Sequence, residues 1–90
     1  MLHSLYGSRY TLLRQELIRS RKLAQLTQVE LAAKLGVGQS LISKIERGES
    51  FMDVLFFIEW CRACNTNPSQ LIDAIANLDY QNLGTLNTPA

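Results

Sequence analysis

The sequence predicts an all-α domain built from five short helices, and three observations support this fold class. Strand signals are almost absent, because the chain has neither sustained alternation of apolar and polar residues nor an Asn-Gly or Asp-Gly hairpin turn. Apolar residues instead recur at helical spacing in five successive segments. With 90 residues, 47% of them hydrophobic, the chain suits one small domain with a real core.

The first predicted helix spans residues 9–24 and follows an N-terminal tail of residues 1–8. One stripe of apolar or small side chains runs along this helix at the spacing of neighbouring turns. The stripe consists of Leu13, Leu17, Ser20 and Ala24. Because the side chains at its C-terminal end are small, we expect another helix to approach closely there.

The second predicted helix, residues 27–35, has clear signals at both ends. Thr27 and Glu30 have the spacing of a capping box, in which each side chain accepts a hydrogen bond from the other residue's amide. Gly36 follows as a residue that can take a positive φ and so end the helix.

A third helix is predicted over residues 39–47, between Gly38 and Gly48. Only the three residues from Gly36 to Gly38 connect it to the helix before. A connection this short that contains glycine is typical of two helices that cross steeply, as in a helix-turn-helix.

Two further helices complete the predicted domain, which spans residues 9–78. Residues 53–65 form the fourth helix, with Asp53 as its N-cap, and the motif Asn67-Pro68-Ser69-Gln70 opens the fifth. The polar segment 79–90 shows no periodicity, so we expect a C-terminal tail that is mobile or ordered only by a partner.

Charge is distributed unevenly, although the formal net charge is only +1. Residues 1–47 hold eight Lys or Arg against three acidic residues, whereas residues 48–90 hold one arginine against five acidic residues. A basic half and an acidic half favour a polyanionic partner on one side of the molecule, although ordinary solvated charge would give the same counts.

The segment LTQVELAAKLGVGQSLISKIERGES, residues 26–50, resembles the DNA-binding domain of the lambda-repressor/Cro-like regulators, also called the XRE-type family. The similarity extends over about residues 17–71. It implies a compact five-helix domain that acts as a dimer on a two-fold DNA operator, and therefore a bacterial or phage regulator, either a repressor or an autoregulator. Gly38 and Ser50-Phe51 depart from the family, whose members commonly carry a hydroxyl N-cap and basic residues there.

The face of the third helix opposite Ile42 and Ile45 is expected to read bases in the major groove of double-stranded DNA. That groove admits one α-helix and presents a distinct donor and acceptor pattern for each base pair. The predicted base-reading residues are Gln39, Ser40, Ser43 and Lys44. Glutamine can pair with adenine and lysine can donate to guanine. The alternative, that Gln28 and Gln39 are ordinary exposed polar residues, is less favoured given the motif.

Phosphate contacts are expected at the start of the second helix, where free amides and the helix dipole favour an anion. Thr27 and Gln28 lie there, and by family analogy Gln28 also braces the side chain at position 39. Arg47 and Arg21 are further phosphate candidates. Arg47 could instead pair with a neighbour, and Arg21 could instead form an ion pair with Glu30 or Glu46.

The motif Cys61-x-x-Cys64 resembles a metal or redox motif, but its context favours a structural role. Both cysteines lie on the buried stripe of a predicted helix, no second such motif exists, and the only histidine is His3. Because zinc usually takes four ligands, we predict no metal and no cofactor. Two cysteines without a secretory signal also suggest free thiols in the cytoplasm, in the region of the bacterial nucleoid.

An exposed aromatic surface is expected on the fourth helix, since a domain this small can hardly bury all of its bulky residues. Such a patch suggests a homodimer formed through the fourth and fifth helices. The predicted interface residues are Phe56, Trp60, Leu71 and Ile75.

Other classes of function fit the sequence less well. An enzyme is not expected, because we find no paired carboxylates, no nucleophile and base set, and no phosphate loop. No apolar run approaches the length of a membrane span. The main alternative is an antitoxin that inhibits a toxin protein and regulates its own gene through the same helix.

Overall fold

The structure is a computed structural model, which describes residues 2–77 of the chain and the side chains from residue 7 onward. These residues form five α-helices and no strand, as the sequence predicts. The helices are α1 (Leu2–Leu23), α2 (Gln28–Leu35), α3 (Gln39–Arg47), α4 (Val54–Ala63) and α5 (Pro68–Ala76).

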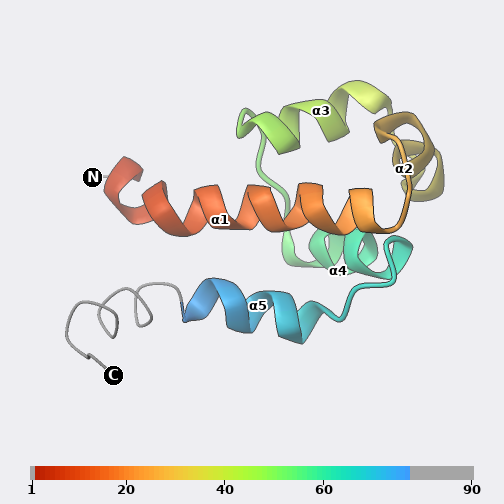
Figure 1. Cartoon of the computed structure of the whole chain (residues 1–90). Coiled ribbons are helices and arrows are strands. Elements are labelled where there is room, and N and C mark those ends of the chain that lie inside the picture. The colour runs from red at the N-terminus through yellow and green to blue at the C-terminus, as the bar shows by residue number, and fades with distance from the viewer. Residues whose placement is uncertain (1, 78–90) are drawn as a thin grey trace.

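The long helix α1 forms the middle of the molecule (Figure 1). Helix α3 lies along one side of α1 and α2 lies near the C-terminal end of α1 (Figure 1). Helices α4 and α5 lie on the other side of α1 from α3 (Figure 1). Helix α2 also packs against α4, and α3 packs against α1. Each helix of the α2–α3 pair is therefore held by a different part of the scaffold.

Helix α1 begins at Leu2, earlier than the predicted start at residue 9, so residues 2–8 continue the helix rather than forming a tail. Proline, the residue that would stop a helix there, is absent from this stretch, and Gly7 is tolerated at a modest cost. At the other end, the chain turns at Gln25, whose φ is +61°. The predicted tail 79–90 lies outside the described residues.

Side-chain caps explain where α2, α4 and α5 begin, whereas α3 follows Gly38 without a side-chain cap. The capping box of Thr27 and Glu30 is present, and the side chains of Asp53 and Asn67 accept hydrogen bonds from the first turns of α4 and α5. Gly36 and Gly48 take left-handed conformations after α2 and α3. The predicted boundaries of the second and third helices are thus accurate to within a residue.

The core lies between α1 and the four shorter helices. Its buried apolar residues are Leu17, Leu31, Ala32, Ile42, Ile45, Phe57, Trp60, Cys61, Cys64 and Leu71. Their burial from all five helices accounts for the fixed position of α3 relative to α1, because apolar contacts supply most of the stability of small helical domains.

Two of the predicted dimer residues, Trp60 and Leu71, belong instead to this core. Trp60 is 0% exposed and Leu71 is 4% exposed. The indole nitrogen of Trp60 donates to the carbonyl of Leu17 and to the hydroxyl of Ser20, each over 3.3 Å. Because the side chain of Ser20 is small, it leaves room on α1 for the indole ring. The helix expected to approach α1 closely at this point is therefore α4, through Trp60. Phe56 and Ile75 are only partly buried.

Both cysteines are free thiols inside the core. Burial raises the pKa of the Cys61 thiol to about 11 and also raises that of Cys64. Among the described side chains, those of residues 7–77, no group of three or more His, Cys, Asp or Glu is placed to hold a metal ion. None of the helices described combines the length and the apolar character needed to cross a membrane.

Candidate nucleic-acid interface

Helices α2 and α3 pack against each other across the short turn Gly36 to Gly38, which gives the helix-turn-helix arrangement (Figure 1). Ile42 and Ile45 anchor α3 in the core. The opposite face of α3 is exposed at Gln39, Ser40 and Lys44. Ser43 is partly buried on the same side. The predicted base-reading residues therefore share one accessible face of one helix.

A buried ion pair fixes α3 to α1. Nε of Arg21 donates to Oε2 of Glu46 over 2.7 Å, and Nη2 donates to Oε1 over 3.0 Å. Nη1 of Arg21 donates to the carbonyl of Leu26 over 2.9 Å. The hydrogen bonds that Arg21 donates to Glu46 raise the pKa of its guanidinium above the ordinary value.

Arg21 therefore does not lie where a phosphate contact needs it. Its side chain is only 10% exposed and its donors are directed at Glu46 and Leu26. The alternative that the sequence left open, an ion pair with Glu46, is the one that the structure contains.

Glu46 also starts a chain of hydrogen bonds that reaches the exposed face of α3. Nε2 of Gln28 donates to Oε1 of Glu46 over 2.9 Å, and Nε2 of Gln39 donates to Oε1 of Gln28 over 2.7 Å. A carboxylate only accepts hydrogen bonds, so Glu46 determines which end of the Gln28 amide faces it. Gln28 in turn presents its oxygen to Gln39.

This order of donors and acceptors leaves Gln39 with its carbonyl oxygen and one N–H directed away from Gln28. One donor beside one acceptor is the pattern that matches N7 and N6 of adenine in the major groove. The brace that family analogy assigns to Gln28 is thus present as a direct 2.7 Å hydrogen bond.

The start of α2 retains the features of an anion site. The hydroxyl of Thr27 accepts from the amide of Glu30 over 3.0 Å, and the Glu30 carboxylate accepts from the amide of Thr27 over 2.9 Å. The capping box uses these two amides, while the first turn of α2 still directs its positive dipole end outward. Thr27 is exposed and Gln28 is half-buried beside this turn.

At the other end of α3, Arg47 is paired with Glu49, so the structure contains the alternative that the sequence left open, an ion pair with a neighbour. Nε and Nη2 of Arg47 donate to the two carboxylate oxygens over 2.9 and 3.0 Å. Nη1 donates to the hydroxyl of Ser43. The Glu49 hydrogen bonds raise the pKa of Arg47, and Arg47 lowers the pKa of Glu49.

Arg14 of α1 is a residue that sequence reasoning missed. Its Nη1 donates to the backbone carbonyl of Glu46 over 3.1 Å, near the negative dipole end of α3. Its Nε is buried without a hydrogen-bond partner among the described residues. The guanidinium lies against Gly48, where an added Cβ would come within 2.9 Å of Nε.

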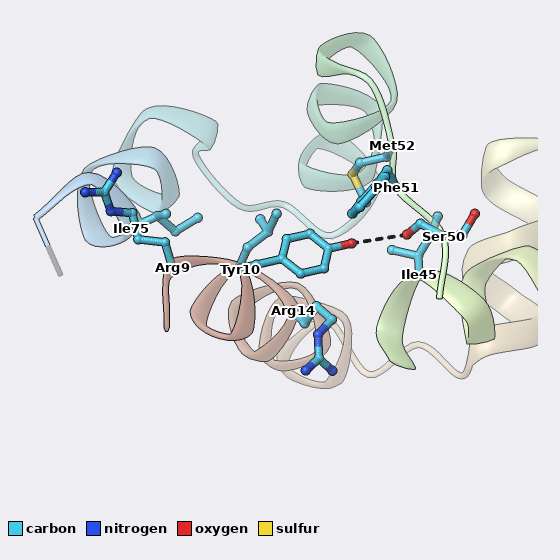
Figure 2. A pocket seen from close by; sticks show the side chains of 9 residues that line it. Arg9, Tyr10, Arg14, Ile45, Ser50, Phe51, Met52 and Ile75 are labelled. Carbon is cyan, nitrogen blue, oxygen red and sulfur yellow. Dashed lines mark hydrogen bonds between the residues drawn. The ribbon is translucent and has the colours of Figure 1, made fainter. Parts of the chain in front are cut away.

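The segment after α3 turns back toward α1 beside a cavity of about 530 Å³ (Figure 2). The hydroxyl of Tyr10 donates to the carbonyl of Ser50 over 3.3 Å, and the rings of Tyr10 and Phe51 meet edge to face at 5.3 Å. The cavity's apolar lining includes Leu13, Ile45, Met52 and Ile75. Ser50 and Phe51 therefore secure the segment to α1, which gives a physical role to residues that replace the basic ones common in the family.

Comparison with known proteins agrees with this geometry. The sequence profile of a helix-turn-helix family matches residues 17–71. An XRE-family like protein from Pseudomonas syringae pv. tomato str. DC3000 has a similar structure, with a TM-score of 0.79 and 36% sequence identity. The alignment covers 86% of this chain and 94% of that protein. No curated protein matches the chain significantly. With the profile spanning more than half of its length, the chain belongs to the XRE-type helix-turn-helix family of DNA-binding transcription regulators.

Proposed function

We propose that this protein is a sequence-specific repressor or autoregulator that binds a two-fold operator as a homodimer, with α3 of each subunit in the major groove. The observation that carries this proposal is the hydrogen-bonded chain from Glu46 through Gln28 to Gln39. A glutamine held in a fixed orientation on the exposed face of a helix is prepared to read a base without first losing side-chain freedom.

Each base-reading residue has its own role in this proposal. Gln39 pairs with an adenine, and Ser40 contributes a hydroxyl in the same first turn. Lys44, one turn further along, donates to guanine O6 or N7. Ser43 lies on this face as well, but its hydroxyl already accepts from Arg47.

Phosphate contacts position the domain on the duplex. The first turn of α2, at Thr27 and Gln28, supplies one such contact through its amides and its dipole. Arg47 supplies another at the opposite end of α3. These two sites flank the base-reading face, as expected if α3 lies along the groove between two phosphate strands.

The homodimer is supported by apolar side chains that the single chain leaves exposed on α4 and α5. Val54 and Leu55 are 70% and 72% exposed, and Ile72 on α5 is 50% exposed. Together with the partly buried Phe56 and Ile75, these residues replace Trp60 and Leu71 in the proposed interface. Light scattering that gives the mass of a monomer at micromolar concentration would exclude the dimer.

The experiment that tests base reading begins with selection of bound duplexes from a random DNA pool. Gln39→Ala should then lower discrimination at one base pair of the selected site by about 1–3 kcal/mol. Gln70→Ala, which removes another exposed glutamine, on α5, is the matched control and should leave discrimination unchanged. An equal loss of affinity for selected and random duplexes in Gln39→Ala would exclude its reading role.

A further inference from the structure

In the free protein, Arg47 already holds a carboxylate in the way that it would hold a phosphate. Glu49 accepts from Nε and Nη2 over 2.9 and 3.0 Å, which is the two-pronged geometry that arginine also forms with phosphate oxygens. The remaining terminal nitrogen donates to Ser43. All three guanidinium nitrogens thus have a partner within the chain before DNA arrives.

The position of Glu49 is determined by the backbone rather than by a chance encounter of two long side chains. Gly48 takes a φ of +81°, which reverses the chain after α3. The amide of Glu49 then donates to the carbonyl of Lys44 over 2.8 Å. This closure fixes the Glu49 backbone beside the last turn of α3, where its carboxylate faces Arg47 and is also stabilised by the charge of Lys44.

The pair is accessible and can open. The side chains of Arg47 and Glu49 are 52% and 55% exposed. Ion pairs this exposed contribute little to the stability of the fold, because water and salt screen them. An incoming phosphate can therefore exchange with the carboxylate without disturbing the core.

We infer that Glu49 is an internal substitute for a DNA phosphate, which occupies Arg47 in the free protein and must be displaced when DNA binds. This inference rests on the proposed function, since it assigns Arg47 to the phosphate backbone. The Arg47–Glu49 pair must open before the guanidinium can hold a phosphate, so the loss of this pair offsets part of the new phosphate contact. Glu49 therefore weakens binding to every duplex, specific or random, and reduces its dependence on salt.

The effect is expected to be independent of sequence, because phosphate contacts carry no base information. A weaker affinity for every duplex benefits a regulator, because non-specific binding depends almost entirely on phosphate contacts. By lowering the general affinity, Glu49 leaves the choice of site to the base-reading residues of α3.

Glu49→Gln tests the inference, because it removes the charge and keeps the shape. Binding to a selected duplex and to a random duplex should both strengthen by about 3- to 10-fold at low salt. The slope of log affinity against log salt should steepen by up to about one. Circular dichroism should show an unchanged fold, since the side chain is exposed.

Glu59→Gln is the matched control. Glu59 forms an exposed pair with Arg62 on α4, so the same charge is lost on the other side of α1 from α3 (Figure 1). We expect less than about a 2-fold change for this variant, because its charge is remote from the proposed interface. An equal gain in both variants would mean that only net charge matters and would overturn the inference.

The Arg47→Ala background separates competition for Arg47 from direct repulsion of DNA. If Glu49 acts by occupying Arg47, most of the gain from Glu49→Gln disappears once Arg47 is absent. A gain that persists in full overturns the inference. Equal binding by wild type and Glu49→Gln overturns it too and leaves the proposed function intact, whereas a wild-type protein that binds no duplex overturns both.

Discussion

Arg21 on α1 and Glu46 on α3, 25 residues apart in the sequence, form a two-pronged ion pair whose side chains are only 10% and 6% exposed. The pair joins the scaffold helix to the helix proposed to read DNA. Glu46 also directs the amide of Gln28, and through it the amide of Gln39. One carboxylate thus links the stability of the fold to the orientation of a base-reading side chain.

Removal of this carboxylate should destabilise the domain strongly. Glu46→Ala is expected to lower the free energy of unfolding by about 3–5 kcal/mol, because Arg21 would remain as a buried charge without its partner. Urea denaturation followed by circular dichroism measures this change. The double variant Arg21→Met/Glu46→Leu, which removes both charges, should be more stable than Glu46→Ala alone. If the double variant is the less stable of the two, the single change acts through something other than an unpaired charge.

The brace on Gln39 gives a second prediction. Gln28→Leu keeps the volume of the side chain but can no longer donate to Glu46 or accept from Gln39. The ratio of affinities for selected and random duplexes should fall by about 5- to 10-fold, because Gln39 would lose its fixed orientation before binding. Competition titrations measure that ratio. If Gln28 only contacts phosphate, both affinities fall equally and the ratio stays constant.

Signals between near neighbours in the sequence predict most of the fold. The capping box of Thr27 and Glu30, and the glycines after the second and third helices, each act within a few residues. Hydrogen bonds this local depend little on the remainder of the chain. They mark the helix-turn-helix and the exposed face of α3 without knowledge of tertiary contacts.

The pairings within the site are not predictable in the same way. Arg21 has two acidic partners at plausible distances along the chain, and only the crossing of α1 and α3 selects Glu46. Trp60 has apolar neighbours all around its helix, so periodicity cannot show which face is buried. Packing against Ser20 decides that question. The role of Arg14 depends on the absence of a side chain at Gly48, a contact between distant segments that no local pattern reveals.

Gly48 gives a third prediction, in which strain and crowding act together. Its φ of +81° disfavours any residue with a Cβ, and the new atom would lie 2.9 Å from Nε of Arg14. Gly48→Ala should therefore lower the free energy of unfolding by about 1–3 kcal/mol. Gly7→Ala is the control, because Gly7 lies within α1 with nothing near its added Cβ. Alanine there should stabilise the protein by up to about 1 kcal/mol, so the two substitutions should differ in sign.

The buried thiol of Cys61 gives a fourth prediction, which concerns pH. Burial raises the pKa of this thiol from 9.0 to about 11, so the folded state holds its proton more tightly than the unfolded chain does. The resulting stability is fully present below pH 9 and is lost as pH rises from 9 toward 11. For one thiol, the loss amounts to up to about 3 kcal/mol.

Urea denaturation with a reducing agent, repeated from pH 8 to 11, measures this loss. Lysine and tyrosine titrate in the same range, so the informative comparison is with Cys61→Ala, which keeps every other group. The variant should be less stable than wild type at neutral pH, because a small cavity replaces the sulfur. Its stability should nevertheless fall less steeply as pH rises, so that the two curves converge. Parallel curves over the whole range would mean that the thiol of Cys61 ionises as easily in the folded protein as in the unfolded chain, and that its burial does not hold the proton.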